Sequence, residues 1–559
     1  MRKPVSEHRG MVVVGVLVAV ANIWHILVQW STNPPDRYFT GIAHYYADYF
    51  LYVSQMAQGA RGSWIMAANK FTDEPLSHTW IYWFNVIAGH IGALAGLTPF
   101  ITYGMLLILL SGILLFLWAQ IARRVFPGQS YAQMIAFVFL ATASNVPDIP
   151  FFWRHGTFAL LSDFWFSPAP ALNRLGGVPH QMLQTILILL VCILFTDRME
   201  ILFHTKTNGS PFRISVMRRI ALFTVISFLA ATANPIQMVL VVPTLLVVIG
   251  VWSLFERRIY MESVVWSAAL IISALIGAIL TNREFAGQPI LTMAKVWEVA
   301  QHFSVSPWTA LCSLGPILLF LPFGCKAYMR PLRSLRVAFL LYAGFAVASF
   351  FSPIPALTFT SPVRWLSPAA YTLFPLLAAA GYVAVSHFLS RFLPKFLRSL
   401  VPGILLSLYL LLTIPALLAQ VEARSIPLAS DPMLQAINHV QKPVTDAFSW
   451  LKHTTNRSDD PSVVLMDPAL PYDVLVPVLT PYTSFTGHPI HTLHPAEKDA
   501  LRQQFFSGGM TGTEVTAFFH DHRIRYVMTT PARQQTLEKY QSLTPVFRND
   551  MIVIDSARP

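Results

Sequence analysis

Charged residues are scarce in this sequence, and cysteine is almost absent. Only 12% of the 559 residues are Asp, Glu, Lys or Arg, about half of the ~25% usual in soluble proteins. That shortage excludes an ordinary soluble globular protein, while 54% hydrophobic residues and a mean hydropathy of +0.53 exclude intrinsic disorder. The 3 cysteines lie within or beside apolar runs, which excludes a disulfide scaffold. The lipid bilayer is the expected solvent for most of the chain.

The sequence also lacks the short motifs of nucleotide chemistry and of common hydrolases. It contains no P-loop, dinucleotide fingerprint, nucleophile elbow or HExxH motif. The formal net charge is +12, but the basic residues are dispersed between apolar segments and form no nucleic-acid patch. Nucleotide hydrolysis and nucleic-acid binding are therefore not predicted.

Apolar segments of membrane-spanning length recur throughout the first 420 residues. A helix crosses ~30 Å of hydrocarbon in roughly 20 residues, and on this basis we predict eleven spans. The first is followed by no small-residue cleavage site, so we expect a retained signal anchor. The spans lie at about 11–30, 101–121, 131–146, 180–196, 217–233, 236–254, 262–280, 307–323, 337–352, 366–386 and 401–420.

The distribution of basic residues predicts the orientation of these spans. With the basic N-terminus inside, the inner segments hold 19 Lys and Arg, counting Arg218 and Arg219 at the start of the fifth span, and the outer loops hold 8, as the positive-inside rule requires. The long outer loops are then 31–100 and 147–179. Segment 79–97 is apolar enough to span, but a span there would turn the pair Arg123 and Arg124 outward. We therefore expect interfacial helices in the first loop, with aromatic rings at headgroup level.

The composition changes after residue 420, where charged and turn-forming residues become frequent. Residues 421–559 predict a small soluble α/β domain on the extracytoplasmic side. His488, His491 and His494 follow one another at intervals of three residues, and could bind zinc, but no nearby carboxylate or cysteine pattern completes a known spacing. The expected strands are 463–466, 473–479, 524–529 and 551–554, with a helix around 495–506.

Asp48 is the most conspicuous polar residue of the first outer loop, within HYYADYFLYVSQMAQGARGSW. Burial among the neighbouring aromatic residues would raise its pKa unless a cation or metal kept it ionised. A carboxylate held there can accept a proton from an acceptor hydroxyl. The alternative interpretation is a helix-capping or interfacial Asp.

Further candidates lie in the second outer loop and before the tenth span. Asp148 and Asp163 are candidates for a second carboxylate or a metal ligand, and Arg174 and His180 for binding a phosphate. Arg364, in TSPVRWLSP, carries a fixed charge and forked donors that suit a lipid phosphate or pyrophosphate. Solvated loop charges and interfacial snorkelling are the respective alternatives.

The order of these parts resembles the GT-C membrane glycosyltransferases. The resemblance covers residues 1 to about 420 and rests on Asp48 soon after the first span, Tyr52 four residues later, the Gly62 and Trp64 turn, and the interfacial segment TWIYWFNVIAGHIGAL. The tail, with GHPIHTLHPAEKDALRQQFFSGG and HDHRIRYVMTT, resembles the extracytoplasmic ends of uncharacterised bacterial GT-C-like proteins. The tryptophan- and aspartate-rich tail motif of oligosaccharyltransferases is absent.

The resemblance implies a mainly α, polytopic membrane enzyme of the bacterial cytoplasmic membrane. It would transfer a sugar, with inversion, from a polyprenyl-phosphate donor to a glycan, lipid or protein acceptor of the cell envelope. Asp48 would be the general base or would orient the acceptor, and Arg364, Arg174 and His180 would bind the donor phosphate. Asp148 and Asp163 would supply an auxiliary acid or a ligand for a divalent cation, whose involvement is left open.

Two other classes of function remain open at the level of sequence. A lipid-linked sugar transporter or flippase would also need many spans, but it would place polar groups near the bilayer midplane. Here the polar clusters lie in outer loops, which favours surface chemistry. A noncatalytic envelope assembly protein is the third class. The sugar, the acceptor and the oligomeric state are beyond the sequence.

Overall fold

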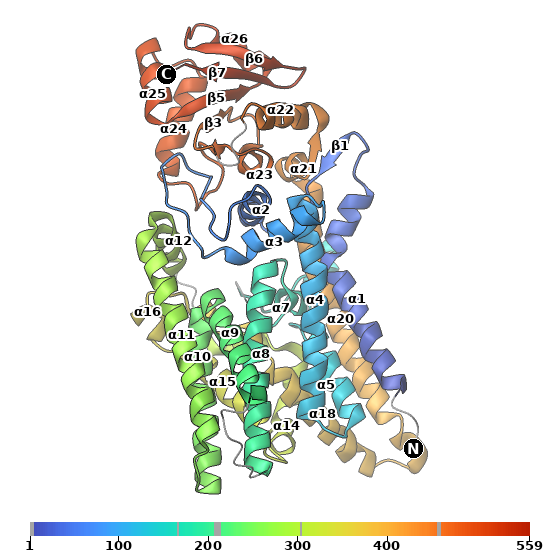
Figure 1. Cartoon of the computed structure of the whole chain (residues 1–559). Coiled ribbons are helices and arrows are strands. Elements are labelled where there is room, and N and C mark those ends of the chain that lie inside the picture. The colour runs from blue at the N-terminus through green and yellow to red at the C-terminus, as the bar shows by residue number, and fades with distance from the viewer. Residues whose placement is uncertain (1–4, 165–166, 206–213, 302–304, 456–459, 559) are drawn as a thin grey trace. The chain divides into compact units, whose positions relative to one another are not determined.

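The computed structural model describes residues 5–164, 167–205, 214–301, 305–455 and 460–558 and is mainly helical (Figure 1). Arg2 and Lys3, in the basic N-terminus of the orientation argument, lie outside the described residues. Among those residues, seven helical segments are long and apolar enough to cross a membrane. They are Arg9–Ser31, Pro99–Val125, Ile214–Ala233, Pro235–Glu256, Met261–Gly287, Pro368–Arg391 and Lys395–Ser430. The chain is a multi-pass membrane protein.

The remaining predicted spans are shorter or interrupted, apart from α8 (Pro179–Thr205), which has 27 residues. Segment 307–323 is not one helix: it is divided into α13 (Pro307–Cys312), the 3-10 helix η1 (Gly315–Leu319) and α14 (Leu321–Tyr328). Gly315 has a positive φ of 63°, and a left-handed residue ends a helix. Helix α5 (Ser130–Thr142) has 13 residues and α15 (Ser334–Phe350) has 17. The number of eleven membrane spans therefore stays a prediction.

Segment 79–97 forms a short helix, α3 (Trp83–Leu94), of 12 residues. At 1.5 Å per residue it is about 18 Å long, well short of the ~30 Å needed to cross a bilayer. One stripe of the helix is buried, and Ile91 and Leu94 on the other side are largely exposed. Segment 79–97 is therefore too short a helix to span a bilayer, and its place along the membrane surface stays a prediction.

The chain forms two compact units. The first unit comprises Met1–Trp24, Leu107–Arg283 and Glu298–Ala423, and it contains most of the apolar helices. The second comprises His25–Leu106, Glu284–Trp297 and Arg424–Pro559. The second unit therefore joins the first outer loop to the C-terminal tail.

Helices α2 (Tyr46–Ala60) and α3 pack closely within the second unit. A Cβ added to Gly59 would lie 2.1 Å from the carbonyl oxygen of Val86, so only glycine permits this approach. Asn85 Nδ2 donates to Gln55 Oε1 at 2.7 Å across the buried interface. This packing fixes α2, which carries Asp48, against α3.

Replacing Gly59 with Ala is expected to lower the free energy of unfolding by about 1–3 kcal/mol, because the added methyl group forces the two helices apart. The measurement is denaturant unfolding of the full chain in detergent. The matched control is Gly104→Ala in α4 (Pro99–Val125), where an added Cβ meets no atom of the described residues within 4 Å. Equal stabilities of the two variants would contradict the close packing.

The C-terminal part of the second unit contains a mixed five-stranded sheet of order β4-β3-β5-β7-β6. Its strands β3, β5, β7 and β6 are labelled in Figure 1. Strand β3 pairs in parallel with β4 and β5, while β5 with β7 and β7 with β6 are antiparallel. A small antiparallel pair joins β1 (Arg37–Phe39) of the first loop to β2 (His439–Gln441) of the tail. The sheet strands are β3 (Val463–Met466), β4 (Thr483–Ser484), β5 (Ile524–Thr529), β6 (Leu543–Arg548) and β7 (Val553–Ala557).

Each face of the sheet has its own covering. Helices α24 (Pro495–Phe506), α25 (Gly512–Asp521) and α26 (Pro531–Leu537) share an apolar core with β3 and β5. On the opposite face, Trp450 of α22 (Lys442–His453) contacts Tyr526 and Phe547. A small C-terminal sheet domain is thus present.

The predicted tail elements agree in part with the structure. Strands 463–466 and 524–529 and helix 495–506 are confirmed, and β7 begins within the predicted strand 551–554. The strand predicted at 473–479 is wrong. These residues form the 3-10 helix η3 (Asp473–Leu475) and the helical turn α23 (Val476–Leu479), with Pro477 in the first turn.

Candidate functional site

Asp48 occupies the first turn of α2, near the positive end of the helix dipole. It is not the N-cap: Tyr45 is, and within the described residues no side chain bonds to the helix end there. The Asp48 side chain is 40% exposed, although its helix is almost wholly buried. The structure therefore favours an accessible carboxylate on a rigid support over a helix-capping Asp.

Aromatic rings and a histidine surround Asp48 on its own side of the second unit. His44 Nε2 lies 2.7 Å from the Tyr103 hydroxyl, and the His44 ring packs at 5.9 Å from the rings of Tyr49 and Tyr52. Tyr52 in turn packs against Tyr82 with ring centroids 6.5 Å apart. Phenol and imidazole groups can hold a polar ligand through hydrogen bonds while excluding bulk water.

The tail contributes two further histidines to this site. His488 is buried, and its Nε2 lies 3.4 Å from Asp48 Oδ1. His491 is also buried, with its ring 4.6 Å from that of His488. Residues more than 400 positions apart in sequence thus meet within one unit.

The protonation of this cluster is set by opposing effects. Burial alone would raise the pKa of Asp48, but its contact with His488 and the charges of His488, His44 and His491 lower that pKa overall. Burial lowers the pKa of His44 to about 4 and that of His491 to about 3. Near neutral pH the site therefore presents an ionised carboxylate beside two neutral imidazoles.

Such a carboxylate can accept a proton from a hydroxyl group or orient that hydroxyl by accepting its hydrogen bond. Because the pKa of Asp48 is low, it is a weak base, and orientation together with electrostatic support of the attacking hydroxyl contributes alongside proton transfer. The aromatic surroundings give the interaction a lower local dielectric than water provides.

A buried ionic cluster fixes the first outer loop against helix α24. Lys498 Nζ forms an ion pair with Asp73, lies 2.7 Å from Glu74 Oε2 and donates to Thr72 Oγ1 at 2.7 Å. Asp73 Oδ2 is also 2.6 Å from His522 Nδ1. Interactions with His522 and Lys498 outweigh burial and lower the pKa of Asp73. This cluster holds the loop that follows α2.

The two predicted auxiliary acids lie in the first unit. Asp148 caps α6 (Ile149–His155), accepting a hydrogen bond from the Phe151 amide at 2.9 Å. Asp163 accepts a hydrogen bond from the Phe164 amide at 2.9 Å. The pKa of Asp163 is raised overall, because desolvation outweighs the hydrogen bonds from Phe164 and Asn145, which lower it. Each carboxylate thus has a backbone amide partner, and the Asp163 side chain is exposed in its loop.

The predicted phosphate-binding residues also lie in the first unit, in different settings. Arg174 of α7 (Ala171–Leu175) is buried, and its terminal nitrogens donate to the carbonyls of Pro168, Ala169, Leu140 and Ala143. Its guanidinium also packs 4.9 Å from the centre of the Tyr371 ring. His180 is the second residue of α8 and is partly exposed.

Arg364 lies in the 3-10 helix η2 (Pro362–Arg364) and forms a bidentate ion pair with Glu298. Its Nε and Nη2 donate to the two Glu298 oxygens at 2.8 and 2.6 Å. The Arg364 side chain is 40% exposed. The Glu298 carboxylate therefore binds the two guanidinium donors of Arg364 that a phosphate would also use.

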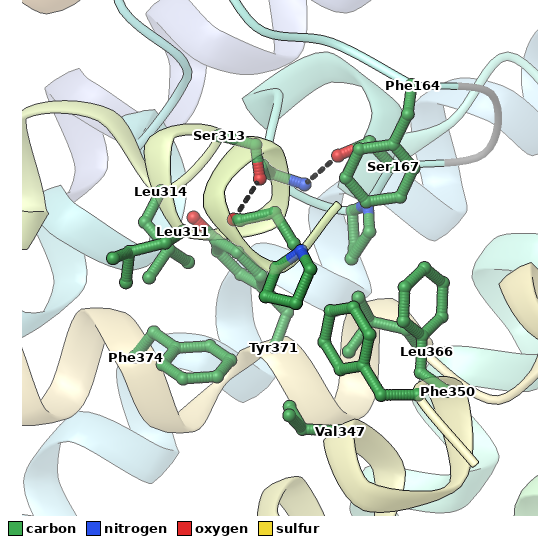
Figure 2. A pocket seen from close by; sticks show the side chains of 15 residues that line it. Phe164, Ser167, Leu311, Ser313, Leu314, Val347, Phe350, Leu366, Tyr371 and Phe374 are labelled. Carbon is green, nitrogen blue, oxygen red and sulfur yellow. Dashed lines mark hydrogen bonds between the residues drawn. The ribbon is translucent and has the colours of Figure 1, made fainter. Parts of the chain in front are cut away.

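An apolar pocket opens within the same unit (Figure 2). Phe164, Phe350 and Phe374 project into it, and Tyr371, which packs against Arg174, forms part of its wall. Ser167 and Ser313 are among the few polar side chains of the lining. A pocket of this composition suits a hydrocarbon chain better than a free sugar.

The divalent cation whose involvement the sequence leaves open has no ready ligand set among the described residues. No three His, Cys, Asp or Glu side chains of the described residues are grouped as metal ligands. His494 is directed toward Glu497, with Nδ1 3.8 Å from Oε1, while His488 faces Asp48. These histidines therefore do not fit a metal centre.

Sequence reasoning singled out Asp48 but missed the contributions of His44 and His488 to its surroundings. His44 lies only four residues before Asp48, just outside the start of α2, and this closeness in sequence is the one signal that could have found it. His488 carried no local signal that connects it to Asp48. In the sequence it is one of three histidines spaced three residues apart.

Comparisons with known proteins find the fold but no close relative. No protein-family model matches the sequence, and no curated protein matches it. The structure of the Archaeoglobus fulgidus oligosaccharyltransferase is similar with a TM-score of 0.50 and 13% identity, over 93% of this chain and 69% of that one. The arabinofuranosyltransferase AftD from Mycobacteria gives a TM-score of 0.51 and 15% identity, over 97% of this chain but only 40% of its own.

ArnT from Cupriavidus metallidurans, bound to undecaprenyl phosphate, is similar over 98% of both chains at 13% identity and a TM-score of 0.45. These neighbours are GT-C membrane glycosyltransferases. The fold likeness is carried by the oligosaccharyltransferase and the arabinofuranosyltransferase. The predicted fold class, mainly α and GT-C-like with a small C-terminal sheet domain, is confirmed.

Proposed function

We propose that this chain is a membrane glycosyltransferase that moves a sugar from a polyprenyl-phosphate donor to an acceptor of the cell envelope. The observation that carries the proposal is the half-exposed, ionised Asp48 carboxylate, held on a buried helix among phenol and imidazole groups. The GT-C fold supports it, since the two structural neighbours that carry the fold likeness are glycosyltransferases.

The proposed reaction is an inverting displacement at the anomeric carbon. An acceptor hydroxyl, oriented by Asp48, attacks that carbon and forms the new glycosidic bond. Its proton passes to the Asp48 carboxylate, and the bond between the anomeric carbon and the phosphate oxygen breaks. Polyprenyl phosphate leaves with that electron pair, and its growing negative charge needs positive donors.

We propose Arg364 as the first candidate for binding this phosphate, followed by His180. Arg364 already binds a carboxylate through two parallel hydrogen bonds, and a phosphate oxygen pair has matching geometry. Arg174 would act indirectly, since its terminal nitrogens hold four backbone carbonyls and shape the loop around the apolar pocket. Asp163 is the preferred auxiliary acid over Asp148, which caps a helix.

The same proposal places the chain in a bacterial cytoplasmic membrane with residues 421–559 on the extracytoplasmic side. The loop charges support this orientation. The apolar pocket of the first unit is a candidate for binding the hydrocarbon chain of a lipid.

The test reconstitutes the full chain in liposomes with undecaprenyl-phosphate sugars labelled in the sugar, and adds an envelope fraction as acceptor. We expect the label to move into the envelope fraction while an equal amount of undecaprenyl phosphate is released. Label that crosses the bilayer still attached to its lipid, with no new product, would contradict transfer and favour transport.

A further inference from the structure

His488 is held in a single orientation by its own loop. Its Nδ1 accepts hydrogen bonds from the backbone amides of Ile490 and His491, at 3.1 and 3.0 Å. In the neutral ring the proton must then reside on Nε2. That atom faces Asp48 Oδ1 at 3.4 Å, slightly beyond the usual range of about 2.7–3.2 Å for N–H···O bonds, a separation that can close when substrate binds.

The loop that carries His488 is fastened to the first outer loop. Thr492 Oγ1 donates to the Phe71 carbonyl at 2.7 Å and accepts from the His488 amide at 3.2 Å. Asn69 Nδ2 donates to the His491 carbonyl at 2.8 Å. The Phe71 ring meets the His488 ring edge to face, with centroids 5.9 Å apart. The tail is therefore held against the segment that follows α2.

His488 and Asp48 differ in their exposure to solvent. His488 has no exposed side-chain surface, whereas Asp48 keeps 40% of its own. A buried donor behind a half-exposed carboxylate can fix one oxygen and leave the other for a ligand. Such a buried supporting contact is typical of a residue that orients a reacting group.

We propose that His488 positions the Asp48 carboxylate, so that the C-terminal segment completes the site built on α2. His488 is a positioning residue and acts through Asp48. This inference rests on the proposed function for its catalytic meaning, but the contact itself can be tested without turnover.

The first test titrates Asp48 by infrared spectroscopy of the full chain, using the carboxylic C=O band that is missing from Asp48→Asn. Other ionisable groups that face or influence Asp48 are His44, His491, Tyr45, Tyr82 and Tyr103. These groups remain in His488→Ala, but the stabilisation of the ionised carboxylate by His488 is lost. The titration midpoint of Asp48 should therefore rise. His488→Gln keeps the bulk and a donor but loses the ionisable ring, and should also raise it.

The control is His494→Asn, in the same segment, at an exposed position with a positive φ of 50° that Asn tolerates. It should leave the titration of Asp48 unchanged. An unchanged midpoint in His488→Gln, or in a folded His488→Ala, would overturn the proposal. If His488→Ala fails to fold, the titration midpoint of Asp48 in His488→Gln alone tests the proposal.

The second test measures transfer. His488→Ala is expected to lose about 10²-fold in kcat, because a misplaced reacting group costs roughly that much, whereas His488→Gln should recover most of the rate. The acidic limb of the pH profile should move to higher pH in both variants. A shifted Asp48 titration in a protein that transfers no sugar would support the contact and refute the proposed function.

Discussion

Replacing Lys498 with Met is expected to lower the free energy of unfolding by about 3–5 kcal/mol, the usual cost of removing one partner from a buried ion pair. Only 3% of the Lys498 side chain is exposed, and the side chain of its partner Asp73 is 7% exposed. Met fills similar space without charge, so Asp73 and Glu74 would lose their shared cation. The measurement is denaturant unfolding of the full chain in detergent.

Two controls separate this effect from a general loss of lysine. Lys452→Met, at an exposed position of α22, should change stability by less than about 0.5 kcal/mol. Adding Asp73→Asn to Lys498→Met should recover part of the loss, because one uncompensated charge is removed. A Lys498→Met protein as stable as the Lys452→Met protein would show that the cluster does not hold the loop.

Replacing Asp48 with Asn is expected to lower kcat for sugar transfer by about 10²–10⁴-fold, the range of a lost general base. Asn has the same size and can still accept a hydrogen bond, but it neither takes up a proton nor carries the negative charge that supports the attacking hydroxyl. Initial rates at saturating donor measure the effect. Asp446→Asn is the matched control, since Asp446 is exposed on α22, and it should retain the wild-type rate.

The sequence predicted those elements whose signals are local. Helix α24 begins with Pro495 in its first turn, a favoured place for proline, and strand β5 is a β-branched and aromatic run. The apolar run 473–479 was predicted as a strand because a short buried helix and a short buried strand share the same hydrophobicity. Pro477, which is common in a first helical turn, was the signal against a strand.

The break in segment 307–323 shows a second limit. The run is apolar enough to cross a membrane, yet Gly315 adopts a left-handed conformation and the chain continues as short helical pieces. A Cβ at Gly315 would meet the Ser144 carbonyl oxygen at 1.9 Å. Packing against a distant segment, which hydropathy cannot register, accounts for this local structure.

The candidate site was predictable only as far as Asp48. Its place among aromatic residues in a long outer loop is visible in the sequence, whereas the 440 positions that separate it from His488 carry no periodic signal. The surroundings of Arg174 were equally hidden, because a guanidinium that binds four backbone carbonyls is indistinguishable in sequence from a free loop arginine. Such contacts depend on the tertiary fold.

Single-turnover transfer by Asp48→Asn and Asp446→Asn, with donor binding measured in the same samples, is the most direct test of the catalytic role of Asp48. The account predicts that both variants bind the undecaprenyl-phosphate sugar as the wild type does, and that only Asp48→Asn loses the transfer step. Equal transfer rates in the two variants would contradict it.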